Sequence, residues 1–309
     1  MAYTERDDLN FLGQLYCIGA NKTPFLNMIG GLSGGKQSTS FNFPVAQPWA
    51  LLARGSSDSV KSETTSISDV TEVTYSRTQD YNTCQIMKYP YGASFAKQST
   101  YGEISNVYKI AGANPVTDEK AFQKSAALKQ LAVDLESDFL NSTYVAQSTS
   151  ATVAKTRGLK DAIDTNTVDA SAATLTKALI DQLLIEMSGN GAIFENCVML
   201  VNAFNKTKVS DIYGYSLPSK SVGGVNVETV VTDFGEMGVV LAPFMPTDEL
   251  YIVEMSVCEP VFTPVKGQII LAIDAPITTA KDGGFIYTQV GLDYGPEEYH
   301  GSLTNLATS

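Results

Sequence analysis

The stretch DEKAFQKSAALKQLAVDLESDFLN, residues 118–141, decides the fold. Asp118 and Glu119 open it, and acidic side chains are favourable in a first helical turn because the amide end of a helix carries partial positive charge. The pattern predicts a helix of about six turns that ends at Asn141. Apolar side chains recur along it at spacings of three and four residues, which is typical of a helix that buries one stripe: they are Leu128, Leu131, Leu135 and Phe139.

Upstream of this helix lies a long segment of β character, residues 37–98. Apolar and polar side chains alternate over 41–45 and again over 87–95, which predicts strands. Half of the residues from 55 to 78 are Ser or Thr, so this middle part cannot bury a core of its own. A two-stranded ribbon is marginal by itself in water. We therefore expect another chain to complete its exposed edges.

Residues 1–36 precede the ribbon and predict an N-terminal arm. The arm holds a short amphipathic stretch and ends in the glycine-rich run GGLSGGK at 30–36. Because glycine-rich runs favour loops, we expect this run to be a flexible hinge.

Downstream of the helix, residues 175–265 alternate predicted helices and strands, which indicates a compact α+β block. Residues 266–309 add strands and a short polar tail that contains His300. The predicted elements are helices over 175–188 and 204–212 and strands over 197–201, 225–231, 237–241, 250–255, 268–273 and 285–292.

The composition is that of a folded protein, with 44% hydrophobic and 17% charged residues over 309 residues. That is too apolar for a disordered chain. The longest apolar runs fall far short of the roughly 18 residues that a membrane-spanning helix needs. The first residues show no signal-peptide pattern, so we expect no export. Four widely spaced cysteines match neither a disulfide framework nor a zinc site, which predicts free thiols in a reducing cytoplasm.

The net charge is −12, with 21 basic and 33 acidic residues. From residue 225 onward, Lys266 and Lys281 are the only basic side chains. Tight recognition of nucleic acid depends on clustered Lys and Arg, so this function class is excluded. We interpret the acidic excess as a source of solubility through like-charge repulsion.

Two motifs resemble parts of nucleotide-binding sites, but the residues that normally accompany them are missing. GGLSGGK at 30–36 has the spacing of a phosphate-binding loop, yet Gln37 follows where Ser or Thr would bind magnesium. The triplet DFG at 233–235 copies the magnesium-binding triplet of kinases, but no kinase catalytic loop accompanies it. We predict a hairpin turn there.

Candidate acid–base residues are equally unpersuasive. His300 is the single histidine, and no serine-nucleophile motif precedes it. Asp134, Glu136 and Asp138 lie on one helix, where 134 and 138 share a face as an ordinary solvated pair. We therefore predict no enzyme, and assign no catalytic, cofactor-binding or metal-binding residue.

Five stretches, in order along nearly the whole chain, resemble the major capsid proteins of tailed bacteriophages, which have the Hong Kong 97 coat fold. The likeness is to a branch of phage major head proteins that lack an obvious maturation region. The stretches are TPFLNMIG at 23–30, YSRTQDYNTCQIMKYPYGASFAKQ at 75–98, KSAALKQLAVDLESDFLN at 124–141, TRGLKDAIDTN at 156–166 and YGPEEYHGSLTNL at 294–306.

The resemblance implies an α+β fold with named parts. They are an N-terminal arm at 1–36, an extended β-loop (E-loop) at 37–98, a peripheral (P) domain at 99–174 with a spine helix at 118–141, an axial (A) domain at 175–265, and returning P-domain strands with a C-terminal tail at 266–309.

The same resemblance implies function and partners. The chain would self-assemble into hexamers and pentamers of an icosahedral head that encloses double-stranded DNA without sequence-specific binding. It would be assembled in the host cytoplasm and reside in the virion, with no cofactor and no membrane. Scaffolding, portal and decoration proteins are possible partners. Because the chain starts directly before the arm, we expect a separate scaffolding protein or unaided assembly.

Contacts between subunits are expected along the E-loop. Such contacts suit large or basic side chains that could meet apolar surface or the acidic body of a neighbour. The candidates are Phe41, Phe43, Trp49, Arg54, Lys61 and Arg77.

Two alternatives stay open at this point. One is an encapsulin-like compartment shell, which would share the fold and differ in what it encloses. The other is a cytoplasmic α+β enzyme whose carboxylate chemistry leaves no recognisable motif.

Overall fold

The computed structural model describes residue 17 and residues 22–49, 62–67, 74–99, 118–214, 219–222, 225–277 and 279–308. The helices are α1 (Pro24–Met28), α2 (Glu63–Ser66), α3 (Phe95–Ser99), α4 (Glu119–Asn141), α5 (Leu159–Ala162), α6 (Lys177–Gly189), α7 (Ala203–Tyr213) and the short 3-10 turns η2 (Met255–Val257) and η3 (Glu297–Tyr299). The strands are β1 (Lys36–Gln37), β2 (Asn42–Ala46), β3 (Asp80–Thr83), β4 (Gln85–Ser94), β5 (Thr167–Asp169), β6 (Cys197–Val201), β7 (Ser219–Val222), β8 (Val225–Thr232), β9 (Gly235–Leu241), β10 (Leu250–Glu254), β11 (Glu259–Phe262), β12 (Ile270–Asp274), β13 (Lys281–Asp293) and β14 (Gly301–Thr304).

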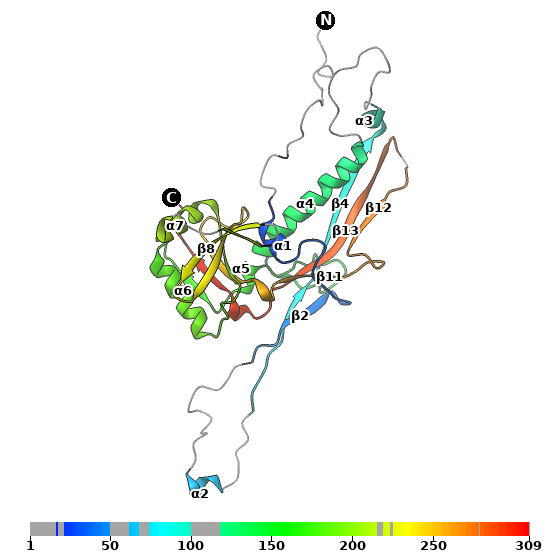
Figure 1. Cartoon of the computed structure of the whole chain (residues 1–309). Coiled ribbons are helices and arrows are strands. Elements are labelled where there is room, and N and C mark those ends of the chain that lie inside the picture. Colours follow the sequence, from blue (N-terminus) through cyan, green and yellow to red (C-terminus); the bar gives the residue numbers. More distant parts are fainter. Residues whose placement is uncertain are drawn as a thin grey trace.

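Helix α4 confirms the helix predicted over 118–141. The Asp118 side chain caps it by accepting a hydrogen bond from the Ala121 N–H at 3.1 Å. Leu131, Leu135 and Phe139 of the predicted stripe are buried, whereas Leu128 is only half-buried. Leu131 packs against Tyr91 of β4 and Ile286 of β13. Figure 1 shows α4 running along the strands of an elongated sheet, beside a compact block. No described helix is long and apolar enough to cross a membrane.

The elongated sheet under α4 has β13 as its central strand. It pairs antiparallel with β4 from Gln85↔Val290 to Ser94↔Lys281, and also with β11 and β12. Strand β4, which we expected from the sequence to lie in the E-loop, therefore belongs to this sheet. The side chains of β4 alternate because every second one is buried under α4, and this gives the same pattern as a ribbon strand.

The compact block is a seven-stranded sheet in the order β5-β14-β10-β6-β9-β8-β7. Strands β6 and β10 are buried along their whole length. Most of the predicted helices and strands of 175–265 are confirmed to within a few residues at their ends. The predicted turn at 233–235 is also confirmed, because it joins the antiparallel strands β8 and β9.

The first part of the segment of β character expected from residue 37 onward is divided between two sheets. Strand β1 pairs parallel with β11 of the elongated sheet, whereas β2 pairs antiparallel with β3 in a separate two-stranded ribbon. Pro44 lies within β2 and cannot donate to a sheet ladder, which suits a strand in a narrow ribbon.

The glycine-rich run at 30–36, which we expected to be a flexible hinge, packs closely against the elongated sheet. Gly35 has a φ of +99°, and a Cβ atom at this position would lie 2.2 Å from the Pro260 carbonyl oxygen. Only glycine fits so close to the neighbouring backbone. Lys36 then places its Nζ 2.8 Å from Asp293 Oδ2 and 3.6 Å from Glu259 Oε2.

His300 connects the two sheets and does not lie in a polar tail, so that expectation is wrong. Strand β14, which follows it, is an interior strand of the compact block. The chain crosses between sheets after β10 and after β13, and His300 joins the two crossings. Its Nδ1 accepts a hydrogen bond from the Glu254 N–H at 3.2 Å, and its Nε2–H donates to the Tyr294 carbonyl oxygen at 2.6 Å. Complete burial lowers the pKa of His300, so the ring is neutral at pH 7.

Candidate assembly surface

The β2–β3 ribbon is fixed firmly where it leaves the body of the molecule. Asn82 is fully buried and donates to the carbonyl oxygens of Leu292 (2.7 Å) and Arg157 (3.2 Å), while its own Oδ1 accepts from the Arg157 N–H at 2.7 Å. On the other strand, the Phe43 ring lies against Gly291 of β13, where a Cβ atom would lie 2.8 Å from it. These contacts give the ribbon a defined direction relative to the sheet.

Beyond this base the ribbon presents aromatic side chains to solvent. Trp49 is 61% exposed, Tyr75 50% and Tyr81 49%. The Trp49 and Tyr75 rings meet edge to face, with centroids 6.2 Å apart, and Trp49 pairs with Arg77 in an antiparallel bridge. We call Trp49, Tyr75, Arg77 and Tyr81 the ribbon surface. Trp, Tyr and Arg are the residue types enriched in the centres of protein interfaces.

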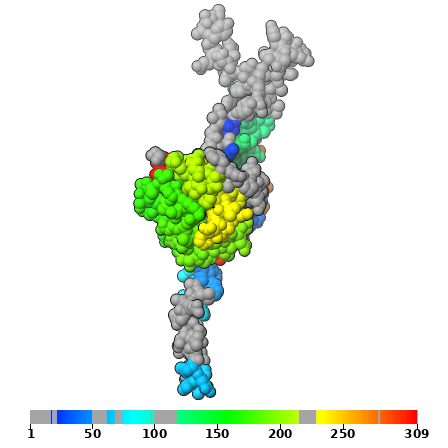
Figure 2. Space-filling view, turned by 60° about the vertical axis from the view of Figure 1, so that its left-hand side comes forward, coloured from blue at the N-terminus to red at the C-terminus, as the bar shows by residue number. Residues whose placement is uncertain are grey.

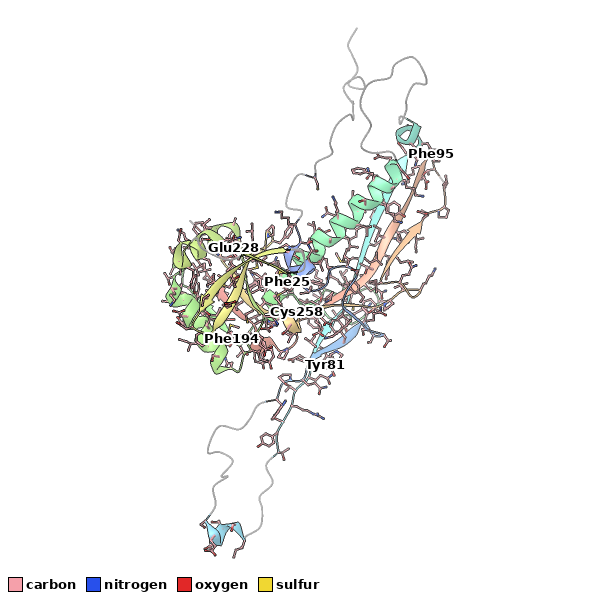
Figure 3. The ribbon with its side chains drawn as sticks, in the orientation of Figure 1. Phe25, Tyr81, Phe95, Phe194, Glu228 and Cys258 are labelled. Carbon is pink, nitrogen blue, oxygen red and sulfur yellow. The ribbon has the colours of Figure 1, made fainter. Side chains whose placement is uncertain are left out.

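Figure 2 shows the projection leaving the body of the molecule, with α2 at its far end. Figure 3 places Tyr81 where the ribbon emerges and Phe95 at the opposite end of the elongated sheet. Helix α2 buries none of its side chains, and Ile67 next to it is 84% exposed. The described residues at the end of the projection therefore have little packing within their own subunit.

The structure separates the predicted contact residues. Trp49 and Arg77 are exposed on the ribbon surface. Phe41 is half-buried against Cys84 and Val261, and Phe43 is only 4% exposed in the same cluster. Phe43 thus stabilises its own subunit, and can influence a neighbour only by holding the ribbon in place. Arg54 and Lys61 lie outside the described residues.

Sequence reasoning missed Tyr75, Tyr81 and Glu136. The two tyrosines stand in polar surroundings, and an aromatic side chain in a Ser- and Thr-rich stretch was the signal available. Glu136 is fully buried, and from the sequence we assigned it no role beyond its place on the helix. Its spacing of three and four residues from Phe139 and Leu140 puts it beside the buried stripe.

Groups of three or more His, Cys, Asp or Glu side chains that could hold a metal ion are absent from the described part of the chain. Cys84, at the ribbon base, is buried, and burial raises its pKa to about 11, so it remains a neutral thiol. What the surface offers is apolar and aromatic contact area on a firmly based projection.

Comparison with known proteins shows which family and which solved structures this chain resembles. A family model described as SU10 major capsid protein matches residues 2–307, and no curated protein matches the chain. Three solved structures have similar folds. The Cyanophage A-1(L) capsid is 10% identical and has a TM-score of 0.61, with 98% of each chain covered. The capsid of a native GTA particle is 13% identical, TM-score 0.56, covering 99% of this chain and 100% of that one. The holo-SrpI encapsulin from Synechococcus elongatus PCC 7942 is 11% identical and has a TM-score of 0.60, with 98% of this chain and 95% of the encapsulin chain covered.

Proposed function

We infer that this chain, which belongs to the SU10 major capsid protein family, builds an icosahedral bacteriophage head from hexamers and pentamers and encloses double-stranded DNA in it. The family is one of structural capsid proteins and not of enzymes, so the enzyme alternative is wrong. The work of this chain is to form a shell from copies of itself.

The observation that carries the proposed assembly is the ribbon surface. Exposing Trp49 and Tyr75 to water does not stabilise a monomer, although buried contacts hold the base of the ribbon in place. Exposed aromatic groups that cluster away from the core mark sites of contact with other chains. Because this surface stands on a ribbon that projects from the body, it can contact a different surface on a second copy, and such heterologous contacts can close into rings.

We assign the projection to the E-loop and shorten it to residues 37–83, since β4 belongs to the elongated sheet. The elongated sheet with α4 then forms the P domain, and the seven-stranded block forms the A domain. Among the described strands, β2 and β3 pair only with each other, so a neighbour could extend their outer edges by strand addition. The candidates Arg54 and Lys61 would add salt-dependent attraction to an acidic neighbour.

Partners other than the chain itself follow from the same role. A head needs an opening through which DNA passes, so we propose a portal protein. The size of the head must also be set, so we propose either a scaffolding protein or closure without one. The net charge of −12 suits a wall that encloses DNA without holding it. Decoration proteins would bind the outer face.

An encapsulin-like compartment remains the second candidate, and a specific observation favours it. The TM-score to the encapsulin, 0.60, is practically equal to that for the cyanophage capsid, 0.61. Fold likeness at about a tenth identity does not separate the two, but the family match supports the phage capsid.

The contents of the particles provide the test. Shells purified from the cells in which they form are treated with nuclease, opened, and examined for DNA and for protein. We expect nuclease-protected double-stranded DNA. Particles that hold a cargo enzyme and no DNA would instead establish the compartment.

A further inference from the structure

The root of the N-terminal arm is fastened to the spine helix by one buried carboxylate. In α1 the Phe25 N–H donates to Glu136 Oε1 at 3.0 Å, and the Leu26 N–H donates to Oε2 at 2.6 Å. Thr23, at the N-cap, supplies no side-chain hydrogen bond. Glu136 of α4 therefore satisfies amides at the start of α1 that would otherwise be unpaired. Figure 3 shows Phe25 at the end of α4, between the two sheets.

We call the contact between α1 and Glu136 the seat. It is closed to solvent and largely apolar. Glu136 and Phe25 are 0% exposed and Leu26 is 1% exposed. No salt bridge to Glu136 is found among the described residues. Its pKa is shifted only by burial and by the two amides. Helix α1 has no titratable side chain, and the charged or titratable groups on the elements packed against α1 and α4 do not shift this pKa. They include Asp134 and Asp138 of α4, Tyr89 of β4, Lys160 and Asp161 of α5, Glu228 of β8 and Asp293 of β13.

A carboxylate in this position is costly, which argues that it has a task beyond packing. Replacing a buried charge by an apolar side chain of similar size is often neutral or stabilising. An apolar side chain, however, could not hold two backbone amides at a chosen point on the helix. Glu136 thereby determines where α1, the root of the predicted arm, sits on the spine helix.

We propose that Glu136 is the positioning residue of the N-terminal arm, and that its contact with α1 sets which neighbouring subunit the arm reaches. The part that concerns neighbours rests on the proposed capsid function. The part that concerns the seat does not, and it can be tested on dissociated subunits.

The seat is expected to depend on pH in a definite direction. Burial raises the pKa of Glu136 to about 7. When α1 leaves its seat, water returns to the carboxyl and its pKa falls toward the ordinary value. The seated form thus binds the proton more tightly, so protonation stabilises the seat and a rise in pH through about 7 weakens it. Between about pH 6 and pH 8, linkage predicts a loss of about tenfold in the seating equilibrium.

Hydrogen exchange of residues 23–29 in dissociated subunits measures this equilibrium, after correction for the intrinsic effect of pH on exchange. Wild-type protection should fall about tenfold from about pH 6 to about pH 8. Glu136→Gln, which imitates the protonated acid, should keep the protection found at the lower pH and lose the pH dependence. Asp134→Asn is the matched control, since Asp134 lies on the same helix and bonds Tyr89 and Gln130; it should behave as wild type.

A wild type without pH dependence, or a Glu136→Gln variant that keeps it, would overturn the proposal for the seat. Glu136→Leu then tests the direction of the arm. We expect it to melt cooperatively and to assemble into irregular particles, because α1 has lost its two acceptors. Regular particles from this variant would overturn the role in arm direction. Failure of the wild type to assemble at all would count against the proposed capsid function and leave the exchange result standing.

Discussion

At the scale of single residues, His300 contributes to the free energy of unfolding by an amount that can be measured. It joins the chain crossings after β10 and β13 through the Glu254 N–H and the Tyr294 carbonyl. We expect His300→Leu to lower the free energy of unfolding by about 1–3 kcal/mol, because it leaves two buried polar groups without partners. Urea denaturation at neutral pH measures this change. Equal stability of variant and wild type would show that the crossings do not depend on the ring.

The titration of His300 predicts a second, separable effect. Burial lowers its pKa, so the folded state holds fewer protons than the unfolded state as pH falls below about 6.5, and stability is lost on acidification. Glu136 acts in the opposite sense over a similar range, so the comparison belongs in a Glu136→Gln background. There, His300→Leu should flatten the decline of unfolding free energy in acid. An unchanged slope would assign the decline to other groups.

The buried stripe of α4 is the third residue-scale test. Leu131 and Leu135 are 0% exposed, whereas Leu128 on the same helix is only half-buried. Leu131→Ala and Leu135→Ala should each cost about 2–5 kcal/mol, since both lose buried area and leave a cavity. Leu128→Ala is the control and should cost less. Thermal unfolding of the three variants checks the order, and equal melting temperatures would mean that the stripe does not face the sheet.

At the scale of elements, the ribbon surface should act between subunits and not within one. Trp49→Ser with Tyr75→Ser removes exposed side chains, so the melting temperature should stay close to that of the wild type while assembly, followed by light scattering, slows or stops. Ile185→Ser is the control, because Ile185 is 63% exposed but lies on α6 of the compact block. Normal assembly of the double variant would remove the ribbon surface from the interface.

Deleting residues 55–72 and closing the ribbon with a short Gly-Ser turn tests the rest of the projection. Helix α2 within this segment buries no side chain, and the cost of loop closure varies slowly with length, so a cooperative melt near that of the parent is expected. The product should be capsomers or soluble subunits in place of shells. A variant that unfolds, or one that still closes into normal particles, would contradict this.

Most elements could be predicted from the sequence because their periodicity reflects burial within the chain. Leu131 and Leu135 lie at helical spacing, and Cys197–Val201 is a short continuous apolar run. Periodicity does not tell which surface buries an alternating strand, and so β4 was assigned to the ribbon although α4 covers it. The assembly surface was predictable only in outline, since Trp49 and Phe43 are both aromatic residues near alternating strands but only the structure shows that one is exposed and the other buried.

Long-range polar contacts were beyond the reach of sequence reasoning. Glu136 bonds amides more than a hundred positions away, and His300 links the ends of two distant strands. A helix pattern shows a glutamate near an apolar stripe but not the amides it will meet. Local rules likewise suggested a flexible hinge at 30–36. They could not predict the close approach of Gly35 to Pro260, because that contact depends on tertiary structure.

At the scale of the whole molecule, the body of the subunit carries a projection whose exposed aromatic groups have no use in a monomer. The elongated sheet with α4, the seven-stranded block and the ribbon occupy different parts of the subunit (Figure 1). Broad surfaces at separate places on one subunit allow ring closure and then contact between rings, as a closed shell requires.

Sedimentation velocity of the purified chain, with its partner proteins supplied if it does not assemble alone, tests the central claim most directly. The account predicts closed particles of megadalton mass, built from subunits of 33.2 kDa, together with capsomer-sized intermediates. Monomers or small oligomers under every salt condition, with all partners present, would contradict it.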